Sequence, residues 1–394
     1  MSAGLRAGYK QTEVGVIPED WEVASLSSVA EKIMVGIASA ATHAYRAKGV
    51  PMFRNQNIKA GHLDDDDLLF ITPEYELAFK NKRLRAGDLL TMRTGYPGVT
   101  AIVPQKYDSA QSFTTLITRP RQHLAESPYL CSFLNSETGQ KFFTESQIGG
   151  AQKNVNAGTL RGMSIPLPPL PEQRAIAAAL SDVDALLGGL DRLIAKKQGL
   201  KVAAMQLLLT GQTRLPGFSG EWEVKRLGDV VQILKGQLIT SSTLLPGDIP
   251  VIAGGKQPAY FHASANRFGR TVTISASGAS AGYVALYDEP IFASDCSTIS
   301  ESESYCLDFV FYQLLRKQQA IYKAQTGGAQ PHIHAKDLNP LFFSFPALPE
   351  QTAVAAVLSE MDTELTALQA RRSKTQALKQ AIMQELLTGR IRLV

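Results

Sequence analysis

Cysteine, long apolar runs and catalytic signatures are scarce or missing in this sequence of 394 residues. The cysteines, Cys131, Cys296 and Cys306, are too few for a disulfide framework, and no two have the spacing of a redox pair or a zinc knuckle. No stretch of about 20 apolar residues could span a bilayer, and the opening residues lack the continuous apolar core of a signal peptide. These absences predict a soluble protein of the reducing cytoplasm.

The motifs that come nearest to catalytic signatures are incomplete. Gly254-Gly255-Lys256 lacks both the earlier glycine and the following Ser or Thr of a phosphate-binding P-loop. Residues 278–282 resemble a nucleophile elbow, but their surroundings predict strand-turn-strand instead of strand-turn-helix. His332 and His334 lack zinc-ligand spacing, and no Asn-Pro-Pro-aromatic sequence is present to hold a base for amino-methylation. The sequence therefore predicts a chain with no catalytic residue, metal site or bound cofactor of its own.

The composition is that of a folded protein with a mild excess of positive charge. Hydrophobic residues make up 44%, and the length is too great for one ordinary core, so at least two domains are expected. The net charge of +4 and the pI near 8.8 are compatible with a phosphate-bearing partner without requiring one.

An internal duplication organises the chain. LPEQ occurs at residues 170–173 and 348–351, an offset of 348 − 170 = 178, and the same offset relates the GGAQ segments at 149–152 and 327–330. MQLLLTG at 205–211 and MQELLTG at 383–389 also follow it, whereas WEV recurs at an offset of 222 − 21 = 201. The order is therefore domain (1–169), helical segment (170–211), domain (212–347), helical segment (348–394).

Both helical segments have the alternating four- and three-residue apolar spacing of a coiled-coil seam. Pro171 and Pro349 suit a first helical turn, and Gly211 and Gly389 suit the left-handed residue that closes a helix. A helix of about 40 residues would be ~60 Å long. The residues predicted to pair the helices and dock partners are Ile176, Leu180, Val183, Leu187, Leu190, Ile194, Val354, Leu358, Met361, Leu365 and Leu368.

Two packing arrangements are compatible with this spacing. Each helix could be an ordinary amphipathic helix packed on its own domain, or the two could pair with each other. Two matched copies of more than the usual globular length favour pairing, although Gly188, Gly189 and Gly199 weaken the first copy locally. For the chain ends to meet, the helices must run antiparallel. The predicted fold class is α+β, with two mixed α/β domains joined by two long antiparallel coiled-coil helices in a pseudo-two-fold duplication.

The two domains contain short β-like runs separated by Gly, Pro, Asn and Asp. Basic side chains can neutralise phosphates or read guanine, and Asn and Gln can read adenine, although many such residues are ordinary solvated surface. The run Asp64 to Asp67 is interpreted as a solvated edge that DNA avoids. The candidate DNA-binding residues are Arg54, Asn55, Gln56, Asn57, Arg93, Gln152, Lys153, Lys235, Lys256, Arg267, Arg270, Gln330 and His332.

The duplicated motifs resemble the specificity subunit of type I restriction-modification enzymes. The likeness covers nearly the whole chain and rests on residues 8–23, 166–173 and 206–230 together with the GGAQ segments. It implies two target recognition domains that bind an asymmetric bipartite site in double-stranded DNA. It also implies docking of methyltransferase subunits, two in number, and of restriction (motor) subunits of an adenine-methylating complex. AdoMet, ATP and Mg²⁺ would then be bound by those partners.

Two other functional classes remain as alternatives. The chain could be an enzyme, such as a fused restriction-methylation polypeptide or a nuclease, although the missing motifs argue against this. It could also be a scaffold whose domains bind protein instead of DNA, which salt-dependent DNA binding by the assembled complex would distinguish.

Overall fold

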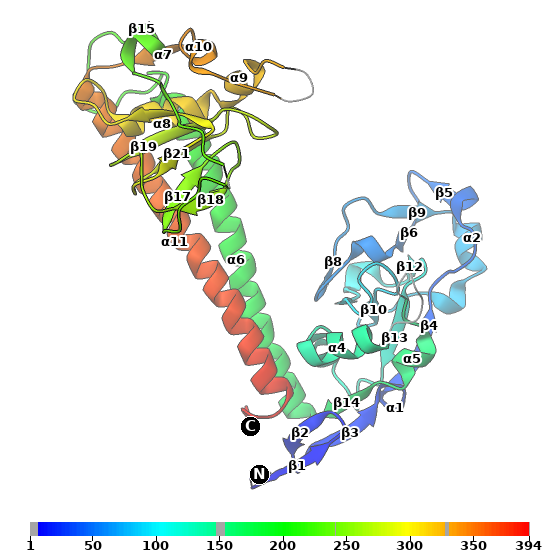
Figure 1. The fold of residues 1–394 in the computed structure, drawn as a ribbon. Coiled ribbons are helices and arrows are strands. Elements are labelled where there is room, and N and C mark those ends of the chain that lie inside the picture. The colour runs from blue at the N-terminus through cyan, green and yellow to red at the C-terminus, as the bar shows by residue number, and fades with distance from the viewer. Residues whose placement is uncertain (1–6, 147–153, 241, 328–330, 394) are drawn as a thin grey trace. The chain divides into compact units, whose positions relative to one another are not determined.

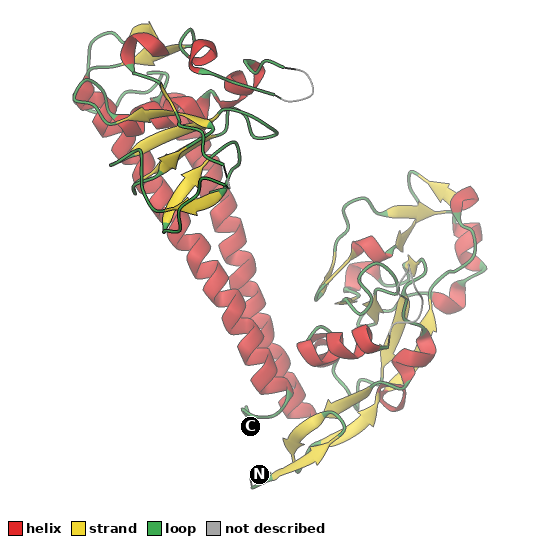
Figure 2. Cartoon of the chain, viewed as in Figure 1, coloured by secondary structure: helices red, strands yellow, loops and turns green. Residues whose placement is uncertain are grey.

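The structure is a computed structural model that describes residues 7–146, 154–240, 242–327 and 331–393. It divides into two compact units, each with mixed helices and strands (Figures 1 and 2). Unit 1 comprises Met1–Gly189 and Arg372–Val394, and unit 2 comprises Leu190–Arg371.

Unit 1 is built on two four-stranded sheets. The first is antiparallel, in the order β11 (Thr100–Ile102), β10 (Leu89–Thr91), β13 (Leu116–Pro120), β4 (Ala30–Val35). The second has the order β12 (Gln111–Ser112), β6 (Val50–Phe53), β9 (Leu69–Ile71), β5 (Tyr45–Arg46), and its β12–β6 pair is parallel. All five residues of β13 are buried, which explains why this strand lies inside its sheet and not at an edge.

Unit 2 repeats this plan, with three strands in place of four in its second sheet. Its first sheet has the order β20 (Val284–Tyr287), β19 (Thr271–Ser275), β22 (Cys296–Ser300), β16 (Leu234–Lys235). Its second has the order β18 (Tyr260–His262), β17 (Ile249–Ile252), β21 (Phe292–Ala293), and β17–β21 is again the parallel pair. The two units thus share one topology although their sequences between the repeated motifs differ.

The remaining elements also correspond. Strands β3 (Glu22–Ser25) and β14 (Ser164–Leu167) pair in unit 1 as β15 (Glu223–Arg226) and β23 (Phe342–Phe345) do in unit 2. The short helices of unit 1 are α1 (Leu26–Val29), α3 (Ser127–Leu134), α4 (Glu137–Glu145) and α5 (Ala157–Arg161). Their counterparts in unit 2 are α7 (Leu227–Val230), α8 (Leu307–Arg316), α9 (Gln318–Lys323) and α10 (Ala335–Leu338).

Unit 1 carries further small elements. They are strands β1 (Tyr9–Thr12), β2 (Gly15–Pro18), β7 (Ile58–Lys59) and β8 (His62–Leu63), helix α2 (Pro73–Leu77), and the 3₁₀ turns η1 (Thr42–Ala44), η2 (Asn55–Asn57), η3 (Lys80–Lys82) and η4 (Gln105–Tyr107). Proline at the start of α2, after the capping side chain of Thr72, matches the preference of helix N-termini.

The two long helices are α6 (Leu170–Leu208) and α11 (Leu348–Leu387), of 39 and 40 residues. In unit 1 Lys379 Nζ lies 2.5 Å from Asp184 Oδ1, and in unit 2 Lys197 Nζ lies 2.7 Å from Glu364 Oε1. Lys201 of α6 reaches Asp362, so residue numbers rise along one helix as they fall along its neighbour. The helices therefore run antiparallel (Figure 1), and the predicted fold class is confirmed.

Each helix end contributes to the core of a unit. The core of unit 1 contains Ile176 and Leu180 from the start of α6 and Leu386 and Leu387 from the end of α11. The core of unit 2 contains Val354 and Leu358 with Leu208 and Leu209. Packing on a domain and pairing between helices therefore occur together, not as alternatives. The other residues predicted to pair the helices are buried (Leu187, Leu190, Ile194, Leu365) or half-buried (Val183, Met361, Leu368).

The helices end as their glycines predict. Gly211 and Gly389 have φ angles of 71° and 67°, the left-handed conformation that a β-carbon disfavours. No helix in the described part of the chain is both long and apolar enough to cross a membrane. Within the same residues, no three or more His, Cys, Asp or Glu side chains are grouped so as to hold a metal ion.

Candidate nucleic-acid interface

Three segments of unit 1 meet at one end of its sheets and form what we call loop cluster 1: residues 54–57, 92–99 and 154–156. The Asn55 side chain accepts a hydrogen bond from Arg93 N (2.9 Å) and donates one to Thr94 Oγ1 (3.1 Å). Thr94 forms a β-bridge with Asn154, and the Arg93 guanidinium donates to the Asn154 side chain (3.2 Å). The turn after β6, the β10–β11 loop and the segment before α5 are thus joined.

Unit 2 brings together the equivalent segments, residues 253–256, 276–283 and 331–334, which we call loop cluster 2. Ser277 forms a β-bridge with His332, the position that corresponds to Asn154 because 332 − 154 = 178. Gly278 N donates to Pro331 O (3.0 Å), and Ile333 N donates to Ala276 O (2.9 Å). A β-carbon on Gly254 would lie 2.6 Å from Ser277 O, so only glycine allows this close approach. The duplication therefore conserves the place of a loop cluster while changing its side chains.

Two of the candidate DNA-binding residues in loop cluster 1 build the turn itself. The Asn57 side chain is 2% exposed, accepts from Arg54 N (2.9 Å) and donates to Asp66 O (3.2 Å). Asn55 uses both ends of its side-chain amide to hold the β10–β11 loop. Arg54 and Gln56 have long polar side chains that take no part in joining the three segments, whereas the Arg93 guanidinium is shared with Asn154.

The acidic run interacts closely with these side chains. Asp67 Oδ2 accepts from Arg54 Nη2 and from Gln56 Nε2, both at 2.9 Å. Asp67 has a φ of 53°, a conformation unusual for a residue with a β-carbon. Asp65 accepts from Lys106 (2.6 Å) and Tyr107 (2.5 Å), and these hydrogen bonds lower the pKa of its carboxyl to about 2. The run is thus more than a solvated edge, because it orients two candidate DNA-binding residues.

The candidate residues of unit 2 fall into two groups. Lys256 and His332 belong to loop cluster 2, where Lys256 Nζ lies 5.6 Å from the centre of the Tyr283 ring and His332 stacks on His334. Arg267, Arg270 and Lys235 lie outside it. Arg267 donates to Thr298 Oγ1 and to Lys235 O, and Arg270 forms ion pairs with Asp288 and Asp308 that raise its pKa. The two arginines therefore have clear stabilising roles.

The candidates Gln152, Lys153 and Gln330 lie outside the described residues. In the sequence, each of their segments leads directly into a loop cluster, at Asn154 in unit 1 and at Pro331 in unit 2.

Sequence reasoning missed a paired arrangement at the helix ends. Arg392 donates to Glu172 and Asp20 in unit 1, and Arg214 donates to Glu350 in unit 2. Each guanidinium also faces a tryptophan ring, Trp21 at 5.8 Å and Trp222 at 5.7 Å. The matching tails of the two repeats could have revealed this arrangement. Arg392 and Arg214 are separated by the repeat offset (392 − 214 = 178), and so are Glu350 and Glu172 (350 − 172 = 178).

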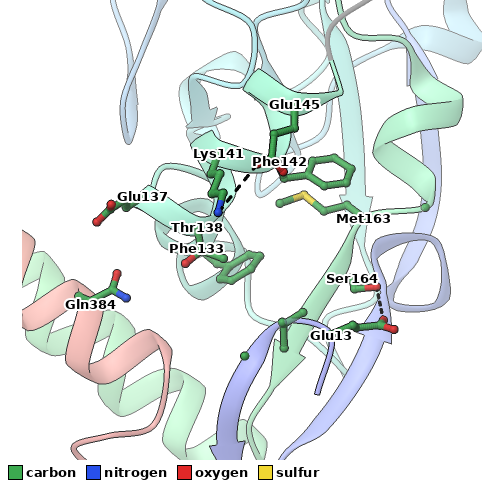
Figure 3. Close-up of a pocket in the computed structure, with 13 residues that line it drawn as sticks. Glu13, Phe133, Glu137, Thr138, Lys141, Phe142, Glu145, Met163, Ser164 and Gln384 are labelled. Atoms are coloured by element: carbon green, nitrogen blue, oxygen red, sulfur yellow. Dashed lines mark hydrogen bonds and ion pairs between the residues drawn. The ribbon is translucent and has the colours of Figure 1, made fainter. Parts of the chain in front are cut away.

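A hollow of about 600 Å³ lies elsewhere in unit 1 (Figure 3). Phe133, Phe142 and Met163 line it together with charged side chains, among them Lys141, which pairs with Glu145. None of the candidate DNA-binding residues that the structure describes is part of its lining. This hollow and loop cluster 1 are therefore separate features of the unit.

Comparison with known proteins identifies the duplicated domains. Residues 18–195 and 219–378 match the family described as type I restriction modification DNA specificity domain. A putative type I restriction enzyme MjaX specificity subunit of Methanocaldococcus jannaschii is 26% identical over 422 residues, covering 98% of this chain and 96% of the relative. The EcoBI specificity subunit of Escherichia coli is 23% identical over 180 residues, covering 45% of this chain and 38% of the relative.

Solved structures support the same fold. The crystal structure of a type I restriction-modification S subunit from M. genitalium aligns with a TM-score of 0.65 at 16% identity, covering 93% of this chain and 96% of that chain. A chain from a structural study of assembly and conformational transition of the type I system aligns with a TM-score of 0.59 at 21% identity, covering 95% and 99%. A specificity subunit is the recognition component and not the catalytic one, which agrees with the predicted class. The chain belongs to the family of type I restriction-modification DNA specificity subunits.

Proposed function

We propose that the chain reads an asymmetric, bipartite DNA target, one half with loop cluster 1 and the other with loop cluster 2. The observation that carries this proposal is that one topology presents the same three segments twice with different side chains. Arg54, Gln56 and Arg93 in the first cluster, and Lys256 and His332 in the second, supply donors and acceptors suited to phosphates and base edges. Because the two sets differ, the two half-sites differ too.

The proposed recognition domains are residues 1–169 and 212–347, and residues 170–211 and 348–394 are the proposed spacer helices. Gln152, Lys153 and Gln330 are proposed contacts because their segments adjoin the loop clusters in sequence. Lys235, Arg267 and Arg270 are weaker candidates. The ion pairs and hydrogen bonds of the two arginines stabilise unit 2, and a DNA contact would compete with them.

The helices are also the proposed docking surface for two methyltransferase subunits, with restriction subunits joining the complex. Leu193, Leu200 and Leu207 of α6 recur every seven residues and are 38%, 48% and 41% exposed. Side chains at this spacing lie on one face of a helix, so they offer a second apolar seam to a partner helix. AdoMet, ATP and Mg²⁺ are assigned to those partners in this proposal.

Docking is tested by co-purification of the chain with its methyltransferase subunit. The Leu200→Glu variant should reduce the amount of partner recovered by at least tenfold, because it places a charge in the apolar seam. Val202→Glu is the matched control, since Val202 is 68% exposed but points to nearly the opposite side of α6. Equal recovery with both variants would contradict docking on this face.

DNA recognition is tested by mapping the methylated motif in cells that carry the complete system. Replacing residues 222–347 by the equivalent region of a relative should change one half of the motif and leave the other half intact. A change in both halves would contradict separate readout. The assembled complex should also bind its target with strong salt dependence, whereas a protein-binding scaffold would show no specific binding to DNA at any salt concentration.

A further inference from the structure

Tyr96 lies at the tip of the β10–β11 loop within loop cluster 1, and its side chain is 79% exposed. Other large apolar side chains of the described chain are comparably exposed, such as Phe268 at 74%, but they lie outside both loop clusters. An isolated exposed aromatic on a protein surface needs no explanation. Tyr96 differs because its backbone is firmly held in the place where we propose DNA is read.

The loop that carries Tyr96 is anchored on both sides. Gly98 N donates to Met92 O (3.0 Å), and Met92 N donates to Val99 O (2.8 Å). Gly95 and Gly98 have φ angles of 82° and 103°, which turn the backbone outward at the tip. A β-carbon on Gly98 would lie 2.3 Å from the ring of Phe143, so the loop also packs tightly against α4. Pro97 and Gly98 are buried, whereas Gly95 and Tyr96 project from this base.

A rigidly presented tyrosine is well suited to stacking. Its side chain has two main torsions, so immobilising it costs little conformational entropy, and its backbone is already fixed. Every nucleobase offers a flat face to such a ring, and protein side chains enter the base stack of a duplex at steps that unstack easily. The neighbouring Arg93 and Asn55 are polar residues of the same cluster, which would keep the ring close to a bound duplex.

We propose that Tyr96 inserts into the base stack of the half-site read by unit 1 and stacks its ring on a nucleobase. This inference rests on the proposed function of loop cluster 1. The equivalent tip of loop cluster 2 is Ala279-Ser280 and has no ring. Stacking by a side chain of this protein is therefore expected in one half-site only, and the two recognition domains handle DNA differently despite their shared topology.

The test uses the full chain co-purified with its methyltransferase subunit and duplexes that carry the mapped target. One base at a time is replaced by 2-aminopurine, whose fluorescence reports unstacking, in both half-sites. The methylated bases are left unreplaced, because the methyltransferase subunit itself flips the base that it modifies out of the stack. The complex should change the fluorescence at one other position, in the half-site of unit 1. Tyr96→Ala and Tyr96→Asn should abolish that change and weaken specific binding by about tenfold, within the range for loss of one stacked aromatic.

Two further variants act as controls. Tyr96→Phe keeps the ring and should bind within about twofold of the natural protein, whereas loss of binding in this variant would show that the hydroxyl matters and not stacking. Phe268→Ala removes a comparably exposed ring outside the clusters and should change neither binding nor fluorescence. Thermal unfolding of Tyr96→Ala should match that of the natural protein, since the side chain is largely exposed.

The outcomes separate this inference from the proposed function. If the natural complex shows no sequence-dependent binding, the proposed function fails. If it binds its target and Tyr96→Ala binds equally well, only the stacking proposal fails. Loss of the methyltransferase subunit from Tyr96→Ala would also overturn it, because the ring would then contact a protein partner.

Discussion

Arg392 binds Glu172, a residue 220 positions earlier in the chain, through two hydrogen bonds of 2.5 and 2.8 Å. Glu172 is fully buried and also accepts from Trp21 Nε1 at 2.9 Å. In unit 2, Arg214 binds Glu350 in the same way, at 2.5 and 2.6 Å. We call the contacts of Arg392 and Arg214 the two tail latches. In each latch, the segment that follows one long helix is bound to the first turn of the other long helix.

The latch of unit 1 should make a measurable contribution to stability. Arg392→Ala leaves the buried Glu172 carboxylate without its cation, and such losses cost about 3 kcal/mol or more in the free energy of unfolding. Arg392 also lowers the pKa of Asp20 through its hydrogen bonds. The stabilisation from that contact is therefore complete at neutral pH and is lost as the pH falls through the lowered pKa. Urea unfolding at several pH values measures both effects.

Arg390→Ala is the matched control for the latch. Arg390 lies two residues away, is half exposed and forms a longer ion pair with Glu385 (3.3 Å). Its loss should change the unfolding free energy by less than about 1 kcal/mol. Adding Glu172→Gln to Arg392→Ala should restore part of the lost stability, because the uncompensated charge is removed. If Arg390→Ala and Arg392→Ala lower the unfolding free energy equally, the tail latch stabilises unit 1 no more than an exposed ion pair does.

The chain should tolerate circular permutation. Tyr9 Oη donates to Gly389 O (2.8 Å), and a β-carbon on Gly389 would lie 2.4 Å from Pro18, so the described ends of the chain lie together in unit 1. A permutant with Val394 joined to Met1 and new ends between residues 212 and 218 should fold and assemble with methyltransferase subunits. It should modify the original target, which methylation mapping would reveal. A permutant opened inside α6 should fail, because it interrupts the helix.

Several of these features could be predicted from the sequence, because they depend on repeated local patterns. The constant offset, the apolar spacing and the capping glycines specify two long helices and a duplicated fold. The DNA-binding residues are harder to predict, since residue type alone does not reveal which hydrogen-bond and ion-pair partners folding places beside a side chain. Asn57 and Arg270 have suitable chemistry for DNA, yet the first is buried in its turn and the second is held between two aspartates.

Cysteine reactivity provides a check on the packing of both units. Burial raises the pKa of Cys131 and of Cys296 to about 12, so the reactive thiolate is much rarer at a given pH than for an exposed cysteine. Cys306 is only half-buried. Iodoacetamide at pH 8 should therefore modify Cys306 first in the folded protein and all three cysteines after denaturation, as mass spectrometry would show. Rapid native labelling of Cys131 or Cys296 would contradict the packing described.

Asp67 should control how sharply loop cluster 1 discriminates between DNA sequences. Its carboxylate is an acceptor only, so it fixes the amide nitrogen of Gln56 toward itself and leaves the amide oxygen turned away. It also holds the guanidinium of Arg54. Asp67→Ala releases Gln56 and leaves Arg54 with only its hydrogen bond to the backbone oxygen of residue 67 (2.8 Å). It also removes a negative charge beside the proposed DNA surface. Binding to non-specific DNA should therefore strengthen, while the preference for the target over non-target DNA falls by at least fivefold.

The control for this prediction is Asp66→Ala, which removes the same charge one residue earlier. The contact of Asp66 with Asn57 is made by its backbone oxygen, so the alanine variant keeps that hydrogen bond. General electrostatics would strengthen non-specific binding equally in both variants. If Asp67 acts by orienting Arg54 and Gln56, only Asp67→Ala should lose discrimination between DNA sequences. The loss should be confined to the half-site read by unit 1. Binding assays on targets that are mutated in one half-site at a time distinguish orientation by Asp67 from general electrostatics. If both variants lose discrimination equally, Asp67 acts through its charge and not through its hydrogen bonds.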